Sequence, residues 1–137
     1  MNSVKIVLPG ERVFSINQTY SRDMRFKTSA FKDWHLRLTT LLEQCSELTA
    51  LAEKWRKDGG NFEVILSAIY PQHLFFNVAG DISSKTIDCS NFEKVLIDII
   101  FGDVMDVNDK YITTLTSHKK PGATYSIEIE IVSKQEF

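Results

Sequence analysis

The apolar and polar residues of the first half of the chain predict one strand and one long helix. A short apolar stretch at residues 4–8 ends at Pro9-Gly10, which predicts a strand followed by a turn. Residues 28–57 carry apolar side chains at spacings of three and four, which predicts a single helix with Thr28 or Ser29 as its N-cap. We expect the polar residues between them, 11–27, to form an ordered loop.

The second half predicts one shorter helix and three further strands, over residues 62–70, 110–116 and 124–132. Leu74-Phe75-Phe76 begins another strand or covers the core. The helix spans about residues 90–101, because its apolar side chains recur at i, i+3, i+4, i+7 and i+8, and Gly102 ends it. A turn around Pro121-Gly122 joins the last two strands.

These elements predict an α/β fold with a mixed sheet of about four strands, packed with one long and one shorter helix. The 137 residues are expected to form one domain, residues 1–137, because 43% hydrophobic and 25% charged residues is ordinary globular composition. The sequence contains no long uncharged apolar run, so we expect no transmembrane helix. The N-terminus does not resemble a signal peptide. The two cysteines lack metal-ligand spacing, and we expect Cys45 to be a reduced thiol in the core.

The net charge of −2 does not by itself favour nucleic-acid binding, but its distribution does. Residues 12–37 are predominantly basic, whereas the second half of the chain is acidic. We expect Arg22, Arg25 and Lys27 to contact DNA phosphates, and Phe26 is a candidate for stacking on exposed bases.

Acidic and amide side chains gather at the start of the second predicted helix. Asn91, Lys94 and Asp98 lie at i, i+3 and i+7, on one side of that helix. Asp88 precedes the helix, and Asp109 opens the next strand. Carboxylates from two separate segments suit Mg²⁺, and a neighbouring lysine can stabilise charge on a phosphate. The pattern therefore indicates metal-dependent phosphodiester chemistry, with Asp88 and Asp109 as metal ligands.

The same residues also have a purely structural interpretation. Ser90 and Glu93 match a capping box, and Asp88 can stabilise the helix dipole. Lys94 and Asp98 match an ordinary i, i+4 surface ion pair. On this interpretation the chain is an interaction protein whose acids are only solvated.

The segment from Asp88 to Asp109 resembles the signature of the RusA family of Holliday junction resolvases. That signature is Asp-x-Asp-Asn-x-x-Lys-x-x-x-Asp, followed by an Asp-Asp pair. Matching positions are Asp88, Asn91, Lys94, Asp98 and Asn108-Asp109. A strand ending in Leu8-Pro9, then Asn17, Tyr20 and Lys27-Thr28, is also similar in order.

The resemblance implies a homodimeric, Mg²⁺- or Mn²⁺-dependent endonuclease that resolves four-way DNA junctions. Asp88, Lys94 and Asp109 would be catalytic, with Asn91, Asp98 and Ser90 in support. It also implies a cytoplasmic protein of bacterial or prophage origin. Ser90 stands where the family has its second motif aspartate, and Asn108 replaces the first member of the later pair. The alternative is therefore a junction-binding protein that cuts weakly or not at all.

Overall fold

The computed structural model describes residues 2–15 and 28–137 of the chain. Arg22, Arg25, Phe26 and Lys27 lie outside them, so the predictions for these four side chains stay predictions. The elements, in chain order, are β1 (Ser3–Pro9), α2 (Ser29–Glu43), α3 (Ser46–Asp58), β2 (Asn61–Pro71), α4 (Gln72–Phe75), α5 (Cys89–Ile97), the π-helix η1 (Asp98–Met105), the 3₁₀ helix η2 (Asp109–Tyr111), β3 (Ile112–Gly122) and β4 (Ser126–Lys134).

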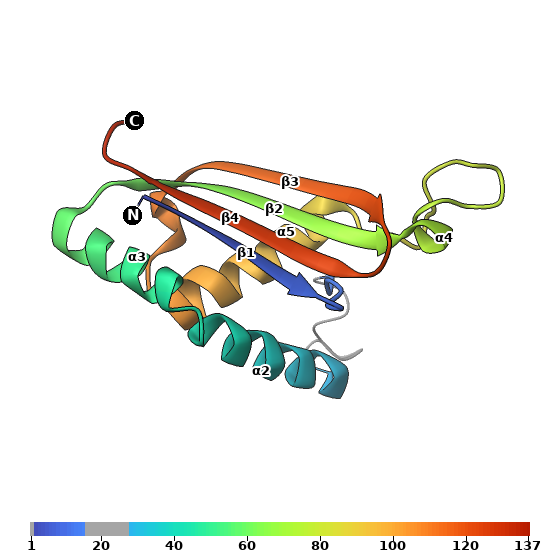
Figure 1. Cartoon of the computed structure of the whole chain (residues 1–137), viewed down its shortest axis with the longest axis horizontal. Coiled ribbons are helices and arrows are strands. Elements are labelled where there is room, and N and C mark those ends of the chain that lie inside the picture. Colours follow the sequence, from blue (N-terminus) through green and yellow to red (C-terminus); the bar gives the residue numbers. More distant parts are fainter. Residues whose placement is uncertain (1, 16–27) are drawn as a thin grey trace.

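The four strands form one mixed sheet in the order β1-β4-β2-β3, as the sequence predicted in outline (Figure 1). β4 is antiparallel to both β1 and β2, whereas β3 is parallel to β2. The predicted turn between the last two strands would have made them neighbours, which is wrong because β2 lies between them. The central position of β2 agrees with its nearly continuous apolar sequence, which is typical of a strand paired on both sides.

All the longer helices cover the same face of the sheet (Figure 1). Alternate strand residues point into this layer, as the buried Ile127, Ile129 and Ile131 of β4 illustrate. From the helices, Trp34, Leu38 and other apolar side chains complete a single core, and Phe75 of α4 covers its end. Within Leu74-Phe75-Phe76 it is therefore Phe75 that covers the core, and the segment does not begin a strand of the sheet. No helix in the described part of the chain is long and apolar enough to cross a membrane.

The long helix predicted over residues 28–57 is two helices, α2 and α3. Thr28 caps α2 as expected, accepting a hydrogen bond from the backbone N–H of Phe31 at 3.2 Å. The helix breaks because Cys45 adopts an extended conformation, with φ −82° and ψ 97°. This bend keeps the apolar side of both helices on the curved core, where Leu42 and Leu48 are fully buried on either side of it.

The second predicted helix is longer than expected and changes its geometry. α5 ends at Ile97, and the chain continues without a break as the π-helix η1 to Met105. Gly102 therefore lies inside the helical segment and does not end it. The end is at Asp106, whose φ of 55° is the left-handed conformation in which helices commonly terminate. π-Helical turns are rare and occur often at functional sites, and this one begins at a predicted site residue, Asp98.

Candidate functional site

Lys94, Asp98 and Asp109 come together on the surface beside β3. The ammonium group of Lys94 donates a hydrogen bond to Oδ1 of Asp98 at 2.9 Å, and lies 3.9 Å from Oδ2 of Asp109. The three side chains are 58%, 56% and 50% exposed, respectively. We call these three residues the Lys94 cluster. Two carboxylates from separate segments thus flank one lysine that solvent and ligands can reach.

Local geometry explains how the sequence builds the Lys94 cluster. Lys94 and Asp98 are one helical turn apart, where α5 passes into η1, so their side chains meet on the same face. Asp109 is brought to them by the return of the chain after η1. It begins η2, where the side chain of Asn108 accepts a hydrogen bond from the N–H of Lys110 at 2.9 Å. Asp109 therefore precedes β3 in a helical turn and does not open the strand directly.

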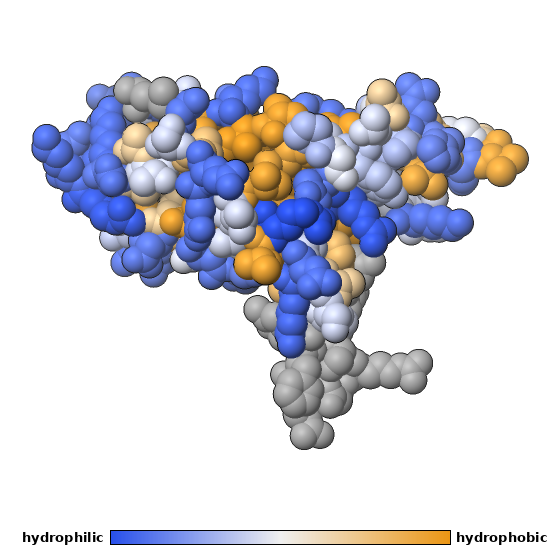
Figure 2. Space-filling model, turned by 60° about the horizontal axis from the view of Figure 1, so that its bottom comes forward, coloured by the Kyte–Doolittle hydropathy of each residue, from blue (hydrophilic) through white to orange (hydrophobic). Residues whose placement is uncertain are grey.

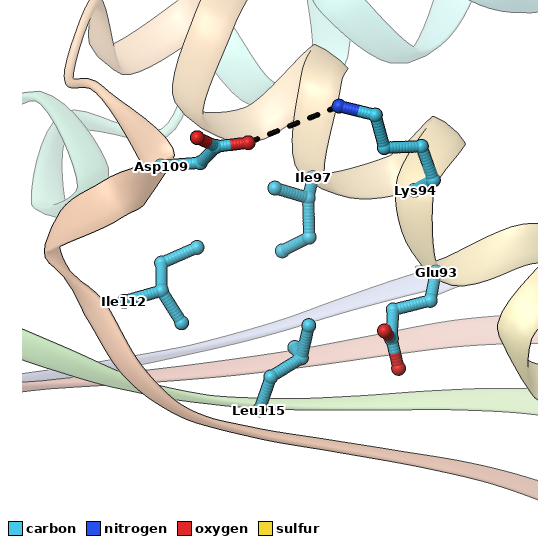
Figure 3. Close-up of a pocket in the computed structure, with 6 residues that line it drawn as sticks. All are labelled: Glu93, Lys94, Ile97, Asp109, Ile112 and Leu115. Atoms are coloured by element: carbon cyan, nitrogen blue, oxygen red, sulfur yellow. Dashed lines mark ion pairs between the residues drawn. The ribbon is translucent and has the colours of Figure 1, made fainter.

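A hollow of about 210 Å³ lies beside this cluster, between α5 and β3 (Figure 3). Its apolar lining consists of Ile97, Ile112 and Leu115. Lys94 and Asp109 point toward each other along one side of it, and Glu93 lies on the side nearer the sheet. The hollow therefore has an apolar floor and a charged rim, which suits a ligand with both apolar and ionic parts.

The start of α5 carries the other predicted site residues, and here the capping-box prediction is wrong. The helix begins at Cys89 with Asp88 as N-cap, and none of the described side chains caps it. Glu93 instead accepts a hydrogen bond from the hydroxyl of Ser117 on β3 at 2.6 Å. Ser90 is exposed in the first turn, and the backbone N–H of Asn91 donates to the carbonyl of Asp88 at 2.9 Å.

Asp88 and Asp109, the two predicted metal ligands, contact different lysines. Oδ1 of Asp88 lies 3.9 Å from the ammonium group of Lys119 on β3, and Asp88 is 77% exposed. Lys119 in turn donates a hydrogen bond to the hydroxyl of Thr86 at 3.1 Å. Asp88 therefore belongs to a separate ion pair, further toward the end of the sheet than the Lys94 cluster.

The two carboxylates keep the lysine of the cluster charged. The hydrogen bond to Asp98 is the main reason that the pKa of Lys94 is raised, followed by the charges of Asp98 and Asp109. Lys94 is therefore an ammonium ion throughout the physiological range. It can donate to an anionic oxygen, but it cannot act as a general base.

A divalent metal is the cofactor that the sequence resemblance implies, and the donor chemistry suits it, because carboxylate oxygens are the ligands that Mg²⁺ prefers. The arrangement of these carboxylates in the structure does not suit a metal ion. Both carboxylates of the cluster are directed at Lys94, and the described residues contain no group of three or more His, Cys, Asp or Glu side chains that could hold a metal ion. These residues, as they are arranged, do not form a metal site.

Sequence reasoning missed two participants of this region, Glu93 and Lys119. Glu93 was assigned to a cap, and Lys119 falls between the predicted strands 110–116 and 124–132, where only a turn was expected. Both residues contact β3 or belong to it. The period-two pattern of β3, which places Ser117 and Lys119 on the face toward α5, is the feature of the sequence that could have identified them. That signal is useful only after the strand order is known, because it depends on β3 pairing with β2.

Comparisons with known proteins leave the family of this chain open. No protein-family model and no curated protein matches it. Among solved structures, the chain is similar to the cell wall anchor of the T6SS from Pseudomonas aeruginosa, with a TM-score of 0.39 and 10% sequence identity. That match covers 97% of this chain and 83% of the other. A TM-score this low carries no argument about function or fold family.

Proposed function

We propose that this chain is a RusA-like protein that binds four-way DNA junctions. The observation that carries the proposal is the Lys94 cluster. Its members match the RusA-like pattern in the sequence, and Asp109 follows Asp98 only after the whole of η1. Their meeting beside the hollow between α5 and β3 supports a shared role.

Within this proposal, Lys94 contacts the DNA backbone. Its side chain is more than half exposed, and the contact of its ammonium group with Asp109 is loose, at 3.9 Å. A phosphate oxygen can therefore replace Asp109 as its second partner without the loss of a good hydrogen bond. The basic stretch at residues 12–37, including Arg22, Arg25 and Lys27, would supply further phosphate contacts.

Cutting of the junction is the second candidate function, and one observation favours it. The Lys94 cluster holds two carboxylates and one ammonium group, so its net charge is negative and it attracts a cation. Mg²⁺ or Mn²⁺ would be that cation in a RusA-like enzyme. Against this, Ser90 places a neutral hydroxyl where such an enzyme has a carboxylate, and we expect weak or absent cleavage.

We further propose that the protein acts in the cytoplasm as a homodimer. A four-way junction is approximately two-fold symmetric, and paired contacts or paired cuts need two equivalent sites. A dimer also presents two copies of the basic stretch to the DNA. Analytical ultracentrifugation of the protein, with and without a junction, measures this directly.

The deciding experiment compares a synthetic four-way junction with a linear duplex of the same sequence, with and without Mg²⁺ or Mn²⁺. Wild type is run beside Ser90→Asp, which restores the motif carboxylate, and Asp109→Asn, which removes one. Ser46→Asp is the matched control, because Ser46 also lies exposed in the first turn of a helix, in α3. Both serine variants gain the same favourable interaction with a helix dipole.

We expect wild type to prefer the junction and to leave it largely uncut. Paired, metal-dependent cuts that appear with Ser90→Asp but not with Ser46→Asp, and that the double variant Ser90→Asp, Asp109→Asn loses, would favour the second candidate. Efficient metal-dependent cutting by wild type would establish the second candidate. Equal, weak binding to junction and duplex would overturn the proposal and favour an interaction protein with solvated acids.

A further inference from the structure

The segment between β2 and α5 forms an ordered projection beyond the end of the sheet (Figure 1). It begins with α4 and continues through residues 76–82, which we call the tip loop. Phe76 and Ile82 form a β-bridge across its base, and the N–H of Ser83 donates to the carbonyl of Phe75 at 2.7 Å. Oδ1 of Asn77 accepts hydrogen bonds from the N–H groups of residues 79 and 81, both at 3.0 Å. The tip loop is therefore held in one shape by its own hydrogen bonds.

The tip loop presents apolar side chains to solvent. Val78 is fully exposed, at 108% of its reference area, and Phe76 and Ile82 are 40% and 49% exposed. The same end of the molecule ends in apolar atoms in Figure 2, beyond a largely hydrophilic surface. Single exposed apolar residues are ordinary on a protein surface. Three of them on one projection are typical of an interaction site.

Cations without a described acidic partner surround the base of this projection. Two hollows meet there and share Lys85. The first, of about 240 Å³, is lined by His73, Leu74, Phe76, Asn77, Val78, Ser83 and Lys85. The second, of about 80 Å³, is lined by Arg12, Val13, Tyr70, Lys85, Ile87 and Tyr125. No carboxylate of the described residues lines either hollow, although the chain as a whole is acidic. Neither Arg12 nor Lys85 forms an ion pair with a described carboxylate.

The projection thus combines an apolar tip with aromatic rings and two cations. These are the groups that bind an unstacked nucleic-acid strand. Apolar wedges separate neighbouring bases, and cations hold the phosphates of the displaced strand. The tip loop is also close to the candidate site along the chain: Asp88 is the N-cap residue of α5, and Lys94 lies six residues further, or about 9 Å along a helix axis. The tip loop and Lys94 are therefore joined by one short stretch of chain, residues 83–93.

We propose that the tip loop is a wedge that unstacks bases at the branch point of a DNA junction. Val78 inserts between the bases, and Lys85 and Arg12 hold phosphates of the strand that is displaced. This inference rests on the proposed function, because it takes a DNA junction as the partner. Unstacking costs least at a branch point, where base stacking is already interrupted, so the wedge also favours junctions over duplex DNA.

The test is the fluorescence of 2-aminopurine placed at the crossover of a four-way junction, which rises when the base loses its stacking. Wild type is compared with Val78→Ser and Lys85→Gln. Val7→Ser is the matched control, because Val7 is 51% exposed in β1, away from the tip loop. Circular dichroism on heating confirms that all variants fold, which we expect because each replaced side chain is exposed.

We expect wild type and Val7→Ser to raise the fluorescence equally, and Val78→Ser to lose most of that rise at saturating protein. Lys85→Gln should weaken binding and reduce the slope of log affinity against log salt by about 0.7, the value for one phosphate of a single strand. Junction binding without any rise, or an undiminished rise with Val78→Ser, overturns the wedge and leaves the proposed function intact. Failure of wild type to bind any DNA overturns both, and the apolar tip would then suit a protein partner.

Discussion

Replacing Lys94 by Met separates its role in DNA binding from its role in stability. Methionine keeps the approximate length of the side chain and removes its charge. The exposed fractions of Lys94, Asp98 and Asp109 are 58%, 56% and 50%, so the ion pairs are solvated and screened. Exposed pairs of this kind contribute about 0.2–1 kcal/mol each. We therefore expect Lys94→Met to lower the free energy of unfolding by no more than about 1 kcal/mol, or roughly 4 °C in melting temperature.

The effect on DNA binding should be larger and should depend on salt. A lysine that contacts one duplex phosphate contributes about 0.9 to the slope of log affinity against log salt. Over a roughly fourfold range of salt, wild type should therefore lose about 3.5-fold more affinity than Lys94→Met does. The assay is fluorescence anisotropy of a labelled junction at several salt concentrations, with thermal unfolding measured on the same samples.

A matched control is Lys54→Met. Lys54 lies on α3, and its ammonium group donates to Oδ1 of Asn2 at 2.7 Å, so it also loses one polar contact. We expect this variant to keep the wild-type salt slope. Two results would refute the reasoning: an unchanged slope in Lys94→Met, which would mean that Lys94 does not contact phosphate, or a loss of stability above about 2 kcal/mol, which would make the Lys94 cluster structural.

Three further predictions concern stability and are checked by chemical unfolding. Burial raises the pKa of Tyr70 above 10.0, so the folded protein holds that proton more tightly, and stability should fall as pH rises above about 10. Tyr70→Phe should reduce this fall. It should also cost about 1 kcal/mol at neutral pH, because the N–H of Ile87 loses its acceptor. Glu11→Gln should cost about 1 kcal/mol, because Glu11 is buried and accepts two hydrogen bonds from Arg37, at 2.7 and 2.8 Å. Asp106→Gly should leave stability unchanged or raise it by up to about 1 kcal/mol, because glycine adopts the left-handed conformation without strain; a clear loss in this variant would mean that the Asp106 carboxylate has a role of its own.

The strands could be predicted from the sequence better than their order. Alternation along β4 identified its buried face, because period two follows from the geometry of a single strand. Its neighbours could not be identified in the same way. A short connection between the last two strands suggested a hairpin, but β2 outcompetes β3 as the partner of β4. Pairing with β2 joins the buried Val64 and Leu66 to Ile131 and Ile129, whereas β3 offers mostly polar side chains.

The site shows the same division between local and distant contacts. The contact between Lys94 and Asp98 was predictable, because residues four apart on a helix face the same way. Asp109 was expected near them from the pattern of acidic residues and from the resemblance, but its distance from Lys94 depends on how η1 ends. The pairing of Asp88 with Lys119 could not be predicted, because it requires β3 to lie at the edge of the sheet beside α5.

The distribution of charge around α5 connects the two proposals. The Lys94 cluster has one more negative than positive charge, so by itself it repels DNA, and its affinity for a phosphate depends on cations elsewhere. Arg12 and Lys85 supply two of them at the far end of the sheet, where none of the described acids lines the hollows. If both proposals hold, Lys94 makes one phosphate contact with any DNA, and the tip loop adds its contacts where a strand is displaced. Charge removal at the two places should then have different consequences: loss of Lys85 mainly reduces the preference for a junction over a duplex, because only a branch point offers a displaced strand, whereas loss of Lys94 weakens binding to both.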